Sequence, residues 1–311
     1  MSWVIVALSA YLILAVANLL DKFLIDNVLS SSKAYVFAAC IMGLIVFLAA
    51  PWFLQWPGLN FFLFDLLAGI ILAIALWLLY EALRRGEVSR ILVIIGGTTP
   101  IFSLIFSVLF FKEHFTNFQW LGIFTLLVGV FIIALLPQSR SYLTRVMHKL
   151  KLVPEIKRGG LILALSSSLA YSLYFISTKY AYGYQPFASA FIWTRLGAAL
   201  LVSLFLLGKK NRHEVLSIFN KKNPNKNKFL VVINQGIGSI GFVLQNYAVF
   251  LGSVAIVNAL QGTQYALLLI ISTILALTSP KLLKETFSWR IFLQKLAAVF
   301  VIGLGLYFLT V

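Results

Sequence analysis

Long apolar segments follow one another along nearly the whole chain, separated by short polar connections. The ten segments, each of about 17 to 25 residues and almost free of charge, lie at residues 3–22, 34–54, 61–83, 91–111, 118–136, 159–181, 187–208, 229–250, 254–278 and 289–309. A helix rises about 1.5 Å per residue and the hydrocarbon layer is about 30 Å thick, so about 20 apolar residues cross it once. The pattern predicts an all-α integral membrane protein with ten transmembrane helices.

The composition and the lengths of the segments exclude other classes of protein. Hydrophobic residues make up 61% of the chain and charged residues 11%, which leaves too little polar surface for a soluble globule. The segments are continuously apolar and too long for the strands of a membrane β-barrel. The first segment lacks the basic region of a secretory signal, so it is interpreted as the first helix. Cys40 is the single cysteine, which excludes an intramolecular disulfide.

The charge of the chain indicates orientation rather than binding to nucleic acid. The net charge is +16, and the basic residues gather in the connections after the first, third, fifth, seventh and ninth segments. The opposite side carries only Lys112 and Lys179. Positively charged connections are retained in the cytoplasm, so we expect a multi-pass protein of the plasma (inner) membrane with cytoplasmic basic loops and both termini outside.

The two halves of the chain resemble each other. Residues 80–110 align with residues 246–276 and pair Ala82 with Ala248, Gly86 with Gly252, Val88 with Val254 and Gly96 with Gly262. Each half contains five segments, and an odd number of crossings leaves the chain on the opposite side of the membrane. A second five-helix repeat therefore enters the membrane in the opposite direction to the first. We therefore predict two inverted five-helix repeats, at residues 1–138 and 159–311, joined by a basic cytoplasmic connection at residues 139–158.

An ordered set of short motifs then points to a family. The set consists of Tyr80, Ala82, Leu83, Ser89, Pro100, Glu113, Gly122 and Gly129 in the first half, and of Tyr174, Phe175, Lys179, Tyr247, Ala248, Glu285, Gly303 and Gly305 in the second. On these residues the chain resembles the drug/metabolite transporter superfamily, specifically its EamA-type members with two five-helix repeats. The chain departs from the family at Ala266, where the repeat of Pro100 would stand, and in its termini, which family members usually keep in the cytoplasm.

One charge is predicted to lie near the centre of the bilayer. Arg195 stands about eight residues, or roughly 12 Å, into its segment, where a lone arginine costs about 2.5 to 3.5 kcal/mol, so we expect a compensating partner. Lys22, Glu81 and Lys179 fall near the far boundary of their segments and are candidates for gating or coupling.

Polar and aromatic side chains at a similar depth complete a candidate substrate site. The substrate-binding candidates are Arg195, Tyr11, Thr99, Ser168, Tyr171, Ser239, Gln261, Gln264 and Tyr265. Such side chains facing a water-filled cavity would bind a polar metabolite. The alternative for each uncharged member is a structural role, because hydroxyl and amide groups also hold membrane helices together.

The function predicted from these features is secondary transport of a small polar metabolite, amino-acid-like or carboxylate-bearing, by alternating access at a midplane site between the repeats. Export is what the resemblance implies. The alternatives are a flippase for a lipid-linked precursor and a non-transporting membrane scaffold. An enzyme is not expected, because His114, His148 and His213 all lie in connections and no metal or cofactor motif appears. The expected partners are the small substrate and membrane lipid, without nucleic acid. Proton or sodium coupling, and a monomer or a homodimer, remain open.

Overall fold

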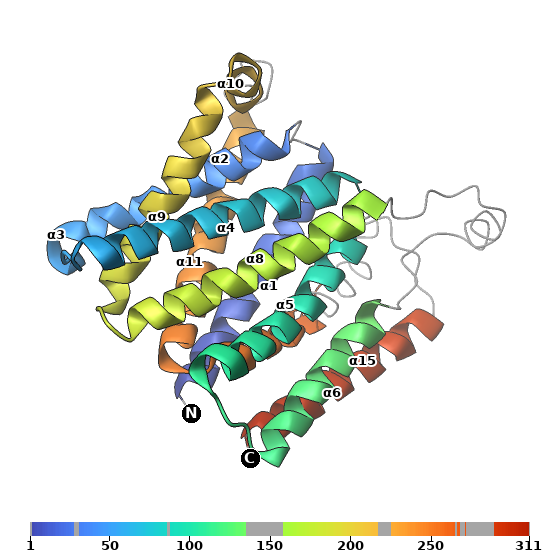
Figure 1. Ribbon diagram of the computed structural model, residues 1–311. Coiled ribbons are helices and arrows are strands. Elements are labelled where there is room, and N and C mark those ends of the chain that lie inside the picture. The colour runs from blue at the N-terminus through green and yellow to red at the C-terminus, as the bar shows by residue number, and fades with distance from the viewer. Residues whose placement is uncertain are drawn as a thin grey trace.

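The computed structural model describes residues 2–27, 31–85, 88–134, 158–216, 225–264, 266–267, 271 and 289–310. Every regular element within these ranges is helical (Figure 1). The elements are α1 (Ser2–Asn27), α2 (Ser32–Met42), the 3₁₀ helix η1 (Gly43–Ala49), α3 (Ala50–Phe53), α4 (Leu59–Arg85), α5 (Val88–Phe111), α6 (Asn117–Ala134), α8 (Arg158–Tyr182), α9 (Phe187–Ser203), the 3₁₀ helix η2 (Leu204–Leu206), α10 (Lys209–Leu216), α11 (Asn225–Leu251), α12 (Val254–Ala259) and α15 (Trp289–Thr310).

The predicted all-helical membrane fold is confirmed. Six helices of the described residues are long and apolar enough to cross a membrane, and three shorter apolar helices lie at Trp3–Asn18, Asn117–Gly129 and Val299–Leu309. The predicted segment 34–54 is divided into α2, η1 and α3, which follow one another without a break. The predicted segment 254–278 is described in part, as α12 and a few residues after it. Ten crossings and the inverted repeat stay predictions.

The connection between α9 and α11 contains a helix that the sequence analysis did not predict. Residues 209–216 form α10, although their sequence is strongly polar. Lys33 on α2 donates to the Asn211 side chain at 2.6 Å, and Ser31 donates to Glu214 at 3.2 Å. These contacts hold α10 against the start of α2 (Figure 1). Tertiary contacts of this kind stabilise a short helix that propensity alone does not support.

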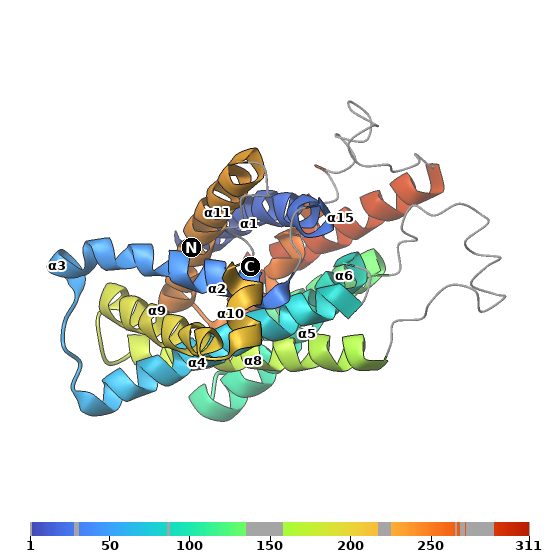
Figure 2. The ribbon, with the colours of Figure 1, turned by 90° about the horizontal axis from the view of Figure 1, so that it is seen from above.

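The helices pack as a central block with two helix pairs against it. In the block, α4 lies along both α8 and α9, and α5 lies along α8. One pair is α1 with α11, and the other is α6 with α15. The second pair forms one edge of the bundle in both views (Figures 1 and 2). By contrast, α2 and α11 scarcely touch.

Glycines allow the closest approach inside the central block. A Cβ atom on Gly197 of α9 would lie 2.1 Å from the backbone oxygen of Leu66 on α4. A Cβ atom on Gly69 of α4 would lie 1.9 Å from the backbone oxygen of Thr194 on α9. The two backbones are therefore in direct contact, which is the type of packing that small residues permit between membrane helices.

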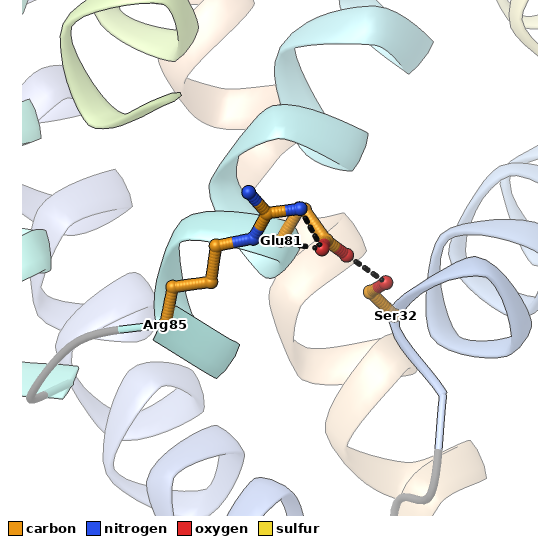
Figure 3. Close-up of polar contacts among 3 residues, drawn as sticks. All are labelled: Ser32, Glu81 and Arg85. Atoms are coloured by element: carbon orange, nitrogen blue, oxygen red, sulfur yellow. Dashed lines mark hydrogen bonds and ion pairs between the residues drawn. The ribbon is translucent and has the colours of Figure 1, made fainter. Parts of the chain in front are cut away.

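The two ends of the bundle are held by different polar contacts. At the end that carries α10, which we call the basic end, Glu81 accepts a hydrogen bond from Ser32 at 2.8 Å and pairs with Arg85 at 2.8 Å (Figure 3). At the opposite end, Lys179 Nζ donates to the backbone oxygens of Val249, Phe250 and Gly252, at 2.9, 3.0 and 2.7 Å. These are the orphan carbonyls at the C-terminus of α11, where a cation is favourable.

Replacing Gly197 with Ala should destabilise the protein by about 1–3 kcal/mol, because the new methyl group forces α4 and α9 apart. The matched control is Gly236→Ala on α11, where nothing lies within 4 Å of the new Cβ atom. Thermal unfolding of both variants in detergent, followed by size-exclusion fluorescence, measures the difference. Equal unfolding temperatures for the two variants would contradict the tight α4–α9 crossing.

Candidate functional site

A cavity of about 200 Å³ lies between α1, α2, η1, α4, α8, α9 and α11. Its wall is mostly apolar, as is usual for small-molecule sites. The polar and titratable side chains in the wall are Asn18, Asp21, Tyr80, Tyr171, Arg195, Asn234, Gln235 and Ser239. Asp21 and Arg195 carry opposite charges, and they come from different helices of the same cavity.

Arg195 is a buried cation held by a phenol and by aromatic faces. Its side chain is 9% exposed, and Nη2 donates to the Tyr174 hydroxyl at 2.6 Å. The guanidinium carbon lies 4.3 Å from the ring centroid of Phe191 and 4.8 Å from that of Phe242. Such cation–π contacts are worth about 2 kcal/mol or more where water is excluded. They provide the compensation that the sequence predicts for an arginine at this depth.

The guanidinium of Arg195 keeps unused hydrogen-bonding capacity. Its Nε is buried and has no hydrogen-bond partner among the described residues. Among the described residues, the ion pair is formed by Arg85 and Glu81. No described carboxylate therefore forms an ion pair with Arg195. A planar guanidinium matches a carboxylate or phosphate in two parallel hydrogen bonds. The arrangement is therefore suited to an anionic group that enters from the cavity.

Tyr174 links Arg195 to α11 through a second layer of hydrogen bonds. The Tyr174 hydroxyl donates to Asn246 Oδ1 at 2.9 Å while it accepts from Arg195. The Tyr182 hydroxyl donates to the same oxygen at 3.2 Å, and Asn246 Nδ2 donates to the Phe242 carbonyl at 2.9 Å. The sequence analysis counted Tyr174 only among the family motifs and did not assign it to the site.

Asp21 lies at the part of the cavity nearest the basic end. Its Oδ1 accepts hydrogen bonds from Tyr35 on α2 and from Asn234 Nδ2 on α11, the latter at 2.6 Å. Asp21 is not among the residues that the sequence predicts for the site. Ser239, which the sequence predicts for the site, lies on α11 with Asn234, and this run of polar residues was the signal that could have located a partner for the carboxylate.

The structure brings some of the predicted substrate-binding residues together. Arg195, Tyr171 and Ser239 all line the cavity. Tyr11 lies between helices, where its hydroxyl donates to the Val257 carbonyl at 2.7 Å. Ser168 accepts from Thr98 at 2.7 Å in the contact between α5 and α8. The contacts of Tyr11 and Ser168 are those of side chains that hold membrane helices together, which is the alternative to substrate binding. Their role in binding stays a prediction.

The other predicted residues lie away from the described wall of the cavity or outside the described residues. The carbonyl of Thr99 accepts from Ser172, at 2.9 Å. Gln264 is buried and Gln261 is half-buried, and neither is in the cavity wall as described. Tyr265 lies outside the described residues, as does the side chain of Lys22.

Glu81 and Lys179, two of the three candidates for gating, have structural partners at the two ends of the bundle. Glu81 pairs with Arg85, four residues on in the same helix. One helical turn of four residues brings that guanidinium over the carboxylate. The exposed Arg85 and the half-buried Glu81 form a pair of the kind worth under about 1 kcal/mol. Lys179 holds the end of α11, as described above.

Comparison with known proteins supports the resemblance that the motifs predict. Residues 1–135 match the EamA-like transporter family. An "Uncharacterized transporter YdfC" of Bacillus subtilis (strain 168) is 32% identical over 114 residues, which are 36% of this chain and 32% of that protein. The match therefore spans about a third of that relative. A solved structure titled "Crystal structure of protein" aligns with a TM-score of 0.65 and 13% identity, covering 98% of this chain and 95% of the other, and shows a shared fold.

Tyr174→Phe should destabilise the protein by about 1.5–3 kcal/mol, the range for a hydrogen bond to a charged group, because Arg195 Nη2 loses its acceptor. Tyr182→Phe is the matched control, since it removes a neutral hydrogen bond to the same Asn246 and should cost only about 0.5–1.5 kcal/mol. Reversible unfolding in mixed micelles with increasing denaturing detergent measures both. An equal or larger loss for Tyr182→Phe would contradict the proposed anchoring of Arg195.

Proposed function

We propose that this EamA-type chain is a secondary transporter that moves a small carboxylate-bearing metabolite across the membrane. The observation that carries the proposal is the state of Arg195, a buried cation in the wall of the cavity. Among the described residues, its Nε has no hydrogen-bond partner and no carboxylate forms an ion pair with it. A cation in the membrane is expensive and usually marks a functional path. A substrate carboxylate would supply the missing charge and the missing acceptor.

The size of the cavity favours a small metabolite. Pockets for drug-sized ligands measure about 300–1,000 Å³, whereas this cavity measures about 200 Å³. A lipid-linked precursor would need a much larger space or a wide lateral opening. The presence of a cavity that Arg195 lines also favours a transporter over a scaffold with a closed interior.

The packing of the helices supports alternating access between inverted repeats. In the two predicted repeats, α1 corresponds to α8 and α4 corresponds to α11. The pair α1–α11 is therefore equivalent to the pair α8–α4, and both pairs pack closely. The same correspondence relates α4–α9, which pack closely, to α11–α2, which scarcely touch. Alternating access requires this asymmetry, in which one interface is closed while its counterpart is open. The polar groups nearest the open interface are those of the basic end.

A thermal-shift screen of the purified protein against carboxylates, neutral sugars, nucleosides and cationic drugs tests the substrate class. We expect stabilisation by one or more carboxylates, of about 2.7 kcal/mol at a concentration of 100 times the dissociation constant. The stabilisation should disappear in Arg195→Ala and remain in Arg84→Gln, which removes an exposed cation outside the cavity. Uptake into vesicles of the stabilising compound should be abolished by Arg195→Ala. Full activity of that variant would remove the proposed role.

The basic end should face the cytoplasm, so the cavity in this conformation is accessible from inside and the termini are outside. Export is the direction that we propose from the resemblance. A tag attached after Val311 should react with a membrane-impermeant reagent in intact cells. A tag at Gly208, beside the basic α10, should react only after lysis. The reverse pattern of labelling would overturn the orientation.

A further inference from the structure

The polar contact between α1 and α11 is a carboxyl–amide pair that is only half satisfied. Asn234 Nδ2 donates to Asp21 Oδ1 at 2.6 Å, and both side chains line the cavity. The other amide atom, Asn234 Oδ1, is buried and has no hydrogen-bond partner in the part of the chain that the structure describes, and Asn234 is 2% exposed. A buried acceptor without a donor is unfavourable, because it has lost its hydrogen bonds to water.

Among the residues that the structure describes, no cation lies in an ion pair that would compensate the charge of Asp21. The titratable groups that face it are Tyr35 on α2 and Tyr80 on α4, and their rings lie 4.5 Å apart in an edge-to-face contact. From α11 the neighbouring side chain is the neutral Asn234. No described lysine or arginine forms an ion pair with Asp21, and the side chain of Lys22 lies outside the described part of the chain. An ionised carboxylate in such surroundings is unfavourable.

We propose that Asp21 and Asn234 form a proton-binding site. A proton on Asp21 Oδ2 would donate to Asn234 Oδ1, while Asn234 Nδ2 continues to donate to Asp21 Oδ1. The result is a cyclic acid–amide pair with two hydrogen bonds. One proton, taken from water in the cavity and returned to it, removes the buried charge and supplies the donor that Asn234 Oδ1 lacks. The Tyr35 hydroxyl keeps its acceptor in both states.

The site lies where a proton would control the opening of the cavity. Asp21 connects α1 to α2 through Tyr35 and to α11 through Asn234, while α2 and α11 otherwise scarcely touch. The protonated pair holds α1 and α11 together near the basic end. Loss of the proton leaves a charge that is stabilised by water, and it favours separation of the helices. The role in transport rests on the proposed function and makes the proton the coupling ion, whereas proton binding itself requires no substrate.

Infrared difference spectroscopy of the full chain in lipid vesicles tests proton binding directly. The spectrum at acidic pH minus that at alkaline pH, in sodium-free buffer without added carboxylates, should show the carbonyl band of a buried carboxylic acid. Asp21→Asn should lack the band that belongs to Asp21, and it should fold because an Asn–Asn pair satisfies the same atoms as the protonated pair. A spectrum identical to that of the unmodified protein would overturn the proposal. A titration that moves in proportion to sodium concentration would assign the site to a metal cation instead and would overturn it as well.

Asp65→Asn is the matched control. Asp65 is a buried carboxyl that accepts from Gln185 Nε2 at 2.7 Å, and it is not among the residues in the cavity wall. This variant should keep the Asp21 band. Loss of that band in Asp65→Asn, with its retention in Asp21→Asn, would place the proton on the wrong carboxyl and overturn the assignment.

The effect on opening is measured with a cysteine at Gly238 in a Cys40→Ala background. Gly238 lines the cavity one turn from Asn234, and a Cβ there meets only Ala17 at 3.8 Å. The rate of reaction with a charged thiol reagent at alkaline pH, normalised to that of the denatured protein, should be severalfold lower in Asp21→Asn than with Asp21 present. Equal rates would refute the control of opening. Both measurements are made without added carboxylate, so a ligand screen in which no carboxylate stabilises the protein leaves them unchanged, and failure of the carboxylate proposal is distinguishable from failure of this one.

Discussion

The arrangement of the cavity depends on one interaction, the burial of the Arg195 guanidinium among aromatic side chains. Its contacts join Phe191 on the same helix to Tyr174 on α8 and to Phe242 on α11. A carboxylate partner would cancel the charge and leave a structural ion pair. A phenol and ring faces lower the cost of burial without cancelling the charge. The site therefore keeps its attraction for an anion.

The packing around this interaction separates rigid helices from helices that have room to move. Gly69 and Gly197 bring α4 and α9 into backbone contact, so this part of the block has no space for sliding. Asp21 on α1 accepts hydrogen bonds from both Tyr35 on α2 and Asn234 on α11, and the backbones of α2 and α11 approach each other at few other places. A polar contact of this kind depends on protonation and hydration, whereas the glycine crossing does not. The cavity thus has one wall fixed by close backbone contact, and the proposed proton-binding site lies in the other wall.

The sequence predicts the positions of the helices better than it predicts the site. The thickness of the bilayer sets the length of an apolar segment that crosses it, so such segments can be located by counting residues. Nine of the ten predicted segments coincide with described helices, and the tenth begins as α12. Arg195 could be found because a single charge in an apolar segment is visible by counting. Its partners Tyr174 and Phe242 could not, because pairing between helices distant in sequence is not encoded in any local pattern. Ser168 and Ser239 illustrate the limit, since they have the same chemistry and only the structure shows that Ser239 lines the cavity.

The change from α-helix to 3₁₀ helix beside Arg195 fits the distinction between rigid helices and helices that have room to move. The segment that begins at α2 becomes η1 at Gly43, which lines the cavity. A Cβ atom at Gly43 would lie 3.5 Å from Arg195 Cδ. A seven-residue 3₁₀ stretch is longer than usual and has poorer hydrogen-bond geometry than an α-helix, so its conversion to another helical form costs little. The helix α2, which precedes η1 in the chain, scarcely touches α11. A change at η1 can therefore move the wall that faces Arg195 without disturbing the α4–α9 crossing.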